Sequence, residues 1–165
     1  MDDFTTARLT ATKLAHDDLS DLVALHLDPE VSRFLGGART AEATADYLDA
    51  NLGHWSDHGV GLWTLRTPDG AFAGRAGLRY VDVEGVTELE IAYTFVKSLW
   101  GQGFATEIAA ALVDVWASRR ADPSLVGIVM KGNAASERVL LKTGFGYERD
   151  ADFHGELCGV FRRYR

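Results

Sequence analysis

The sequence has little cysteine and no long apolar run. Because Cys158 is the only cysteine among 165 residues, an intrachain disulfide and a zinc site built on several cysteines are excluded. No run of 18 apolar residues predicts a membrane-spanning helix. Residues 1–4 lack the basic and apolar segments of a secretory signal. We therefore expect a protein of the reducing cytoplasm that does not act in a membrane.

Positive charge is also scarce. Lys and Arg number 17 against 24 Asp and Glu, which gives a formal net charge of −7. Nonspecific binding to nucleic acid needs a basic face, so this balance argues against a nucleic-acid partner. A cationic small substrate suits an acidic protein better, although mild acidity also serves solubility alone.

The chain has enough apolar residues for one core. It is 47% hydrophobic, and its length is that of one ordinary domain rather than two. No internal repeat or low-complexity segment interrupts it. We expect residues 1–165 to form a single domain.

Hydrophobic periodicity and turn residues predict elements in the order β-α-α-β-β-β-α-β-α-β-β. The predicted strands are 8–14, 62–67, 71–81, 88–95, 125–130, 145–150 and 156–164, and the predicted helices lie within 18–27, 40–58, 105–119 and 134–142. Turns at 68–70 and 82–85 join three of the strands into an antiparallel meander, which leads into one βαβ crossover. The predicted fold is an α/β (α+β) fold with a mixed sheet.

A glycine-containing loop separates strand 88–95 from helix 105–119. Its sequence, Trp-Gly-Gln-Gly-Phe-Ala-Thr over residues 100–106, leaves main-chain N–H groups unpaired at a helix start, where they favour an anion. Gly101 and Gly103 would let a pyrophosphate approach the main chain. Alternatively, the glycines only make a tight turn. A P-loop motif is absent, and a dinucleotide fingerprint would need Gly or Ala where Thr106 stands.

With Glu107 added, this loop resembles the coenzyme A loop of the Gcn5-related N-acetyltransferases (GNAT), and its closest branch there is the ribosomal-protein alanine acetyltransferases. Residues 133–136 (Asn-Ala-Ala-Ser), 142–145 (Lys-Thr-Gly-Phe) and 70–78 also match. The resemblance covers roughly residues 8–164. It implies the GNAT fold, acetyl-coenzyme A as co-substrate, an amine as acceptor and no metal.

The resemblance also implies which residues bind the co-substrate. The pantetheine arm would pair with main chain near two residues at the end of the meander, and the loop would hold the pyrophosphate. The implied cofactor-binding residues are Phe95, Val96, Trp100, Gly101, Gln102, Gly103, Phe104, Ala105, Thr106, Asn133 and Ser136. Many members have a general-acid tyrosine four residues before the Gly-Phe pair, where this chain has Leu140. A tyrosine acid is therefore not carried over.

Acetyl transfer needs a neutral amine and a route for its proton. Neutralising a lysine amine costs about 4 kcal/mol at neutral pH, whereas an α-amine costs about 1 kcal/mol. Glu90 is the best candidate base, acting through water; an equal alternative is a strand residue that faces solvent or pairs with Arg79. Ser136 resembles the family serine near the coenzyme A sulfur. Asn133 and Ser136 also fit the start of a helix, as N-cap and N3 residues.

Several other side chains carry weaker signals. His54 and His58 have helical zinc spacing but no obvious third ligand. His154 lies in the loop before the last strand, where it either faces the acceptor site or is simply exposed. The tryptophans at 55, 63 and 100 and Phe34 either line the acceptor pocket or belong to the core. The final strand, if exposed, could pair two copies, so a monomer and a homodimer both stay open.

We therefore expect an acetyl-coenzyme A-dependent N-acetyltransferase. Its acceptor is expected to be a protein N-terminal α-amine or, next, a small-molecule amine. An alternative is a catalytically silent coenzyme A-binding or sensor module, which the absence of the tyrosine at position 140 would favour. A nicotinamide-nucleotide oxidoreductase is disfavoured, because its glycine loop should follow an early strand of a parallel sheet.

Overall fold

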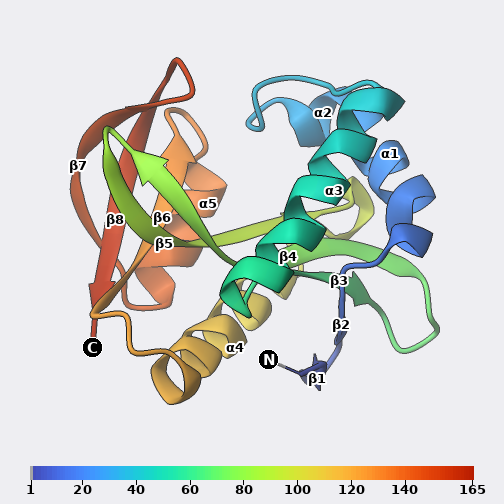
Figure 1. The fold of residues 1–165 in the computed structure, drawn as a ribbon, viewed down its shortest axis with the longest axis horizontal. Coiled ribbons are helices and arrows are strands. Elements are labelled where there is room, and N and C mark those ends of the chain that lie inside the picture. Colours follow the sequence, from blue (N-terminus) through green and yellow to red (C-terminus); the bar gives the residue numbers. More distant parts are fainter. Residues whose placement is uncertain (1) are drawn as a thin grey trace.

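The computed structural model of this chain describes residues 2–165, which form one eight-stranded sheet in the order β1-β2-β3-β4-β5-β6-β8-β7 (Figure 1). The strands are β1 (Phe4–Thr5), β2 (Thr10–Lys13), β3 (Leu62–Arg66), β4 (Phe72–Val83), β5 (Val86–Phe95), β6 (Ser124–Met130), β7 (Gly146–Phe153) and β8 (Glu156–Tyr164). The helices are α1 (Leu19–Leu27), α2 (Pro29–Ser32), α3 (Ala41–His58), α4 (Phe104–Arg119) and α5 (Ala134–Lys142). Within residues 2–165, no helix has both the length and the apolar character needed to span a bilayer.

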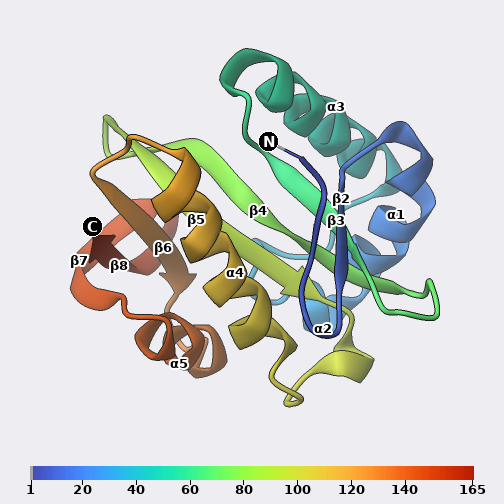
Figure 2. The same cartoon turned by 90° about the horizontal axis from the view of Figure 1, so that it is seen from below.

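The helices cover the two faces of the sheet. Helices α1, α2 and α3 lie on one face, and α4 and α5 lie on the other (Figure 2). Side chains alternate along β5, so Leu89 and Ile91 pack into the core with Ile108 and Leu112 of α4. A smaller cluster on the opposite face joins Leu22, Leu48 and Leu62 with Leu14. The mixed α/β architecture is confirmed.

Strands β5 and β6 are the parallel pair of the crossover. Their pairing is limited to Glu90 opposite Val126, whereas β4 and β5 pair along their whole length. Beyond this point the two strands separate, as Figure 2 shows. The main-chain edge of β5 is therefore left unpaired on the side where the strands diverge.

A glycine brings α5 close to β6. A Cβ atom at Gly127 would lie 2.5 Å from Cδ1 of Leu140, so a larger residue would push the helix away. Leu140 is 1% exposed and belongs to the core. Residue 140, where many members of the family have a general-acid tyrosine, is therefore a core leucine here that packs α5 against the sheet.

Two features differ from the sequence-based expectations. The two-residue strand β1 was not predicted, because so short a segment shows no alternation. The final strand β8 lies between β6 and β7 and is not exposed at an edge, so the condition for pairing two copies through that strand is not met. The β7–β8 hairpin places β7 outermost, because β8 pairs with β6 along its length.

Candidate functional site

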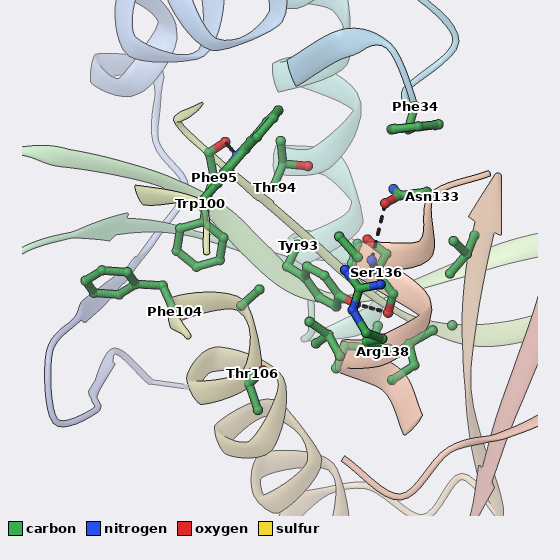
Figure 3. A pocket seen from close by; sticks show the side chains of 18 of the residues that line it. Phe34, Tyr93, Thr94, Phe95, Trp100, Phe104, Thr106, Asn133, Ser136 and Arg138 are labelled. Atoms are coloured by element: carbon green, nitrogen blue, oxygen red, sulfur yellow. Dashed lines mark hydrogen bonds between the residues drawn. The ribbon is translucent and has the colours of Figure 1, made fainter. Parts of the chain in front are cut away.

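A cleft of about 610 Å³ lies where β5 and β6 separate (Figure 3). Its walls come from β4, β5, β6, the start of α4, α5 and the segment around α2. The predicted site residues that line it are Glu90, Phe95, Trp100, Gly101, Gly103, Phe104, Ala105, Thr106, Asn133 and Ser136. Val96 and Gln102 do not line it. The structure thus brings ten of the predicted residues into one space, although they come from three parts of the chain: β5, the glycine loop with the start of α4, and the start of α5.

The glycine loop presents a row of main-chain donors to the cleft. Gly101 and Gly103 adopt φ angles of 73° and 83°, in the left-handed region that favours glycine. The first helical hydrogen bond of α4 runs from Glu107 N to Gly103 O. Among residues 2–165, no group accepts a hydrogen bond from the N–H groups of residues 101–106. These donors, with the helix dipole behind them, fit a pyrophosphate.

The loop is held in place from outside the cleft. Glu107 Oε2 accepts a hydrogen bond of 2.7 Å from Arg8 Nε, and Arg8 Nη1 donates to Gln102 O at 2.9 Å. The Gln102 side chain donates to Ser98 O, away from the cleft. Trp100 Nε1 donates to Phe95 O at 2.9 Å. Gln102 is therefore placed as a support of the loop, and its side chain does not reach into the cleft.

The expected main-chain partner at Val96 must be corrected. Val96 N donates to Ala73 O at 2.9 Å, and Val96 O accepts from Leu99 N at 3.1 Å, so both groups are already used. In an antiparallel ladder, the main-chain N–H and C=O groups of successive residues point alternately toward and away from the partner strand. Because Val96 N bonds to β4, the main-chain groups of Tyr93 and Phe95 point away from β4 and toward β6. The strand edge that is free to pair with a ligand lies at the main chain of Tyr93 and at Phe95 N, because Phe95 O already accepts a hydrogen bond from Trp100 Nε1.

The start of α5 faces this edge. Asn133 Oδ1 accepts a hydrogen bond of 3.2 Å from Ser136 N, so the expected N-cap role of Asn133 is confirmed. No residue in 2–165 hydrogen-bonds the Ser136 hydroxyl. Tyr93 donates its phenolic hydrogen to Ser136 O at 3.2 Å, as Figure 3 shows. Burial raises the pKa of Tyr93, so the phenol keeps its proton.

Tyr93 was not singled out from the sequence. Its position on β5 gives it the same alternation as the core residues Ile91 and Phe95, which indicates a buried residue and no more. Only the approach of α5 to β5 places its hydroxyl beside Ser136. The sequence carries no local sign of this contact, because the two residues are 43 positions apart.

Glu90 lies on the other face of β5. It is 4% exposed, and its Oε2 accepts a hydrogen bond of 2.7 Å from Arg79 Nε across the β4–β5 ladder. The Arg79-paired interpretation is therefore confirmed, and the solvent-facing one is wrong. Burial acts to lower the pKa of Arg79, but the Glu90 carboxylate raises it above its ordinary value. Oε1 of Glu90 has no hydrogen-bond partner in the described part of the chain.

The remaining candidates lie outside the cleft, except Phe34. Both ring nitrogens of His54 are used, one by Val60 O and the other by Tyr80 N. Residues 2–165 contain no group of three or more His, Cys, Asp or Glu side chains arranged for a metal ion. His154 packs on Phe153 in the β7–β8 turn and does not line the cleft. Trp55 and Trp63 pack edge to face in the core, and Cys158 is buried.

Comparisons with known proteins agree with this geometry. Residues 8–146 match the sequence model described as the acetyltransferase (GNAT) domain. The uncharacterized protein YkkB of Bacillus subtilis (strain 168) is 31% identical over 137 residues, which cover 82% of this chain and 80% of that protein.

Two solved structures share the fold at 18% sequence identity. Aminoglycoside acetyltransferase AAC(6')-Ib in complex with coenzyme A has a TM-score of 0.81 and covers 95% of both chains. The ribosomal L7/L12 alpha-N-protein acetyltransferase RimL, also in complex with coenzyme A, has a TM-score of 0.80 over 96% of this chain and 95% of its own.

Proposed function

The chain belongs to the acetyltransferase (GNAT) domain family and is an acetyl-coenzyme A-dependent N-acetyltransferase, and we propose that it acetylates an α-amine by direct attack within one ternary complex. The observation that carries the proposal is the continuity of the cleft. One space of about 610 Å³ joins the donor loop at 101–106 to Glu90. No cysteine lines it, so a thioester intermediate on the protein has no place there.

The residues that line the cleft fit acetyl-coenzyme A in one orientation, with its pyrophosphate at the glycine loop and its thioester near Ser136. The N–H groups of residues 101–106 would hold the pyrophosphate, and the free edge of β5, at the main chain of Tyr93 and at Phe95 N, would pair with the pantetheine amides. The thioester would then lie between β5 and α5, close to Ser136. Arg138 and Lys142 of α5 also line the cleft and supply positive charge for the outer phosphate.

The chemistry needs one proton removed and one supplied. The amine nitrogen bonds to the thioester carbonyl carbon, and the C–S bond breaks to release the thiolate. Glu90, through its free oxygen and a water molecule, takes the proton that the amine loses. The Ser136 hydroxyl is the donor on the thiolate side, where the leaving group takes a proton, and Tyr93 holds the start of α5 through its hydrogen bond to Ser136 O.

The proposed acceptor follows from the weakness of this base. A carboxylate is a weak base for an amine, and one oxygen of Glu90, Oε2, is already engaged by Arg79 Nε at 2.7 Å. An α-amine needs little help to become neutral, whereas a lysine amine needs about 3 kcal/mol more. RimL and AAC(6')-Ib have nearly equal TM-scores, so likeness of fold does not choose between a protein N-terminus and a small-molecule amine.

The test is a peptide that carries both kinds of amine. We expect a peptide with a free N-terminus and one internal lysine to be acetylated at the N-terminus, with the site located by fragment mass spectrometry. The control is the same peptide with its N-terminus already acetylated, which should release no coenzyme A above background. Acetylation of the lysine in either peptide, at a comparable rate, would contradict the proposed acceptor.

A further inference from the structure

Besides the Glu90–Arg79 pair, the cleft has another charged side chain, Arg75, on the α1–α3 face of the sheet. Arg75 lies opposite Thr94 on the β4–β5 ladder, and it shares a strand face with Arg79. Its side chain lines the cleft, yet the residue is only 3% exposed. Arg75 is therefore a buried cation that reaches the space where the acceptor must enter.

Neutral groups surround this guanidinium. Arg75 Nε donates to His26 Nε2 at 3.4 Å, and the other nitrogen of that ring, Nδ1, lies 3.1 Å from Thr44 Oγ1. Because Nε2 accepts, the ring proton is on Nδ1, which donates to Thr44. Burial, with the charges of Arg75 and Arg39, lowers the pKa of His26 to about 3, so the imidazole is neutral. His26 positions Arg75 without balancing its charge.

Positive charge exceeds negative charge at this end of the cleft. The Tyr47 ring lies between two guanidinium groups, 4.9 Å from Arg75 and 4.8 Å from Arg39. Neither arginine pairs with a carboxylate among residues 2–165, and the nearby Glu90 is already bonded to Arg79. The cation–π contacts offset part of the cost of burying these charges, but within residues 2–165 the Nη groups of Arg75 have no hydrogen-bond acceptor. This local excess is opposite to the net charge of the chain.

We propose that the acceptor carries a carboxylate beside its reacting amine, and that Arg75 binds this carboxylate as the specificity-determining residue of the site. The inference rests on the proposed function, because it assigns the acceptor to the same cleft. A guanidinium matches a carboxylate with two parallel N–H donors, and both would be desolvated here. The carboxylate comes from one of two sources: the α-carboxylate of a small amino acid, or an acidic side chain near a peptide N-terminus.

The location supports this assignment. Arg75, Arg79 and Glu90 are on one face of β4 and β5, while Tyr93 and Phe95 are on the other. The acceptor would therefore meet the thioester from the α1–α3 side, between Arg75 and Glu90. Phe34 and Met130 add apolar walls at this side of the cleft.

The experiment compares matched acceptors that differ only in charge. One pair is L-leucine and L-leucinamide, and the other is a pair of peptides that begin Ala-Glu and Ala-Gln. Each is assayed with the wild type, Arg75→Met and Arg75→Lys. We expect Arg75→Met to lower kcat/KM for the acidic member of one pair by about tenfold or more, and to change the neutral member by less than about twofold. The variant-to-wild-type ratio removes differences in amine reactivity.

Arg75→Lys should give an intermediate loss, because it keeps the charge without the paired donors. The affinity for acetyl-coenzyme A should be the same in all three proteins. The pair that responds identifies the source of the carboxylate. If both members of both pairs lose activity together, or if no member does, the inference is overturned.

A binding measurement separates this inference from the proposed function. The measurement is the shift in unfolding temperature when an acetylated product is added to the protein with coenzyme A present. One pair of products is N-acetyl-L-leucine and N-acetyl-L-leucinamide, and the other pair is the N-acetylated Ala-Glu and Ala-Gln peptides. Failure to acetylate any amine would contradict the proposed function. Even then, the inference would be supported if the anionic product of a pair stabilised the wild type more than the neutral product did, and if this difference disappeared in Arg75→Met. Equal stabilisation by both members of each pair would overturn it.

Discussion

Replacing Gly103 by Trp is expected to weaken acetyl-coenzyme A binding by at least about 100-fold, as measured by calorimetric titration. Gly103 is the residue before α4, and its φ of 83° turns the N–H groups of the loop toward the cleft. A Cβ atom at this position would lie 3.5 Å from Arg8 Nη2, so an indole would displace Arg8, whose hydrogen bond to Gln102 O holds the loop, and would move the donors away from a pyrophosphate. Losing two charge-assisted hydrogen bonds costs about 3 kcal/mol or more, which accounts for the expected change.

The matched control is Gly70→Trp. Gly70 has nearly the same backbone conformation, with φ of 84°, and lies in the β3–β4 turn, away from the cleft. A Cβ atom there has no neighbour within 4 Å, so the substitution brings the same backbone strain without displacing a residue that holds the glycine loop. Wild-type affinity is expected in this control. Unchanged affinity in Gly103→Trp would mean that the loop does not hold the pyrophosphate.

Replacing Glu90 by Gln is expected to lower kcat by about 100-fold while leaving the affinity for acetyl-coenzyme A within about twofold of the wild type. The amide can still accept a hydrogen bond from Arg79, so the side chain should keep its place on β5. It cannot take a proton from the amine, even through water. Steady-state rates at saturating co-substrate measure the change, and thermal unfolding checks that the fold persists.

Glu88→Gln is the control for this substitution. Glu88 lies two residues earlier on the same face of β5, and it too pairs with an arginine, with Oε1 2.7 Å from Arg162 Nη2. It does not line the cleft, so kcat should stay close to that of the wild type. If the two variants lose activity equally, the effect comes from breaking an ion pair, and Glu90 is not the base.

The parts of the site that sequence predicts are those with local causes. A glycine loop before a helix leaves its N–H groups unpaired wherever the fold places it, so residues 100–106 could be identified directly. The Asn133 cap is similarly local, because it depends on residues three positions apart. The order of the central strands followed from turn residues at 68–70 and 82–85.

The parts that sequence did not predict depend on contacts between distant segments. The hydrogen bond from Val96 N to Ala73 O follows from the register of β4 and β5, and a shift of one residue in that register would have left Val96 N free. The position of β8 inside the sheet depends on how the last hairpin docks on β6. Tyr93 meets Ser136 only because α5 packs over the cleft.

The positive charge around Arg75 in the cleft was the feature hardest to predict from the sequence. A net charge of −7 favours a cationic substrate, whereas the cleft itself contains a buried arginine with no carboxylate partner in residues 2–165. His26, Arg39, Tyr47 and Arg75 come from three separate elements and the loop before α3, and no spacing between them is characteristic. Composition averages over the whole surface, so it carries little information on a small enclosed space.

The central claim is that an acetyl group passes directly from coenzyme A to an amine bound in the same cleft. The most direct test follows the intact mass of the protein and the release of free thiol, first with acetyl-coenzyme A alone and then after an α-amine acceptor is added. Direct transfer predicts no acetylated protein and little thiol before the acceptor is added, followed by equal amounts of thiol and acetylated acceptor. An acetylated protein that forms first and then passes its acetyl group to the acceptor would contradict the account.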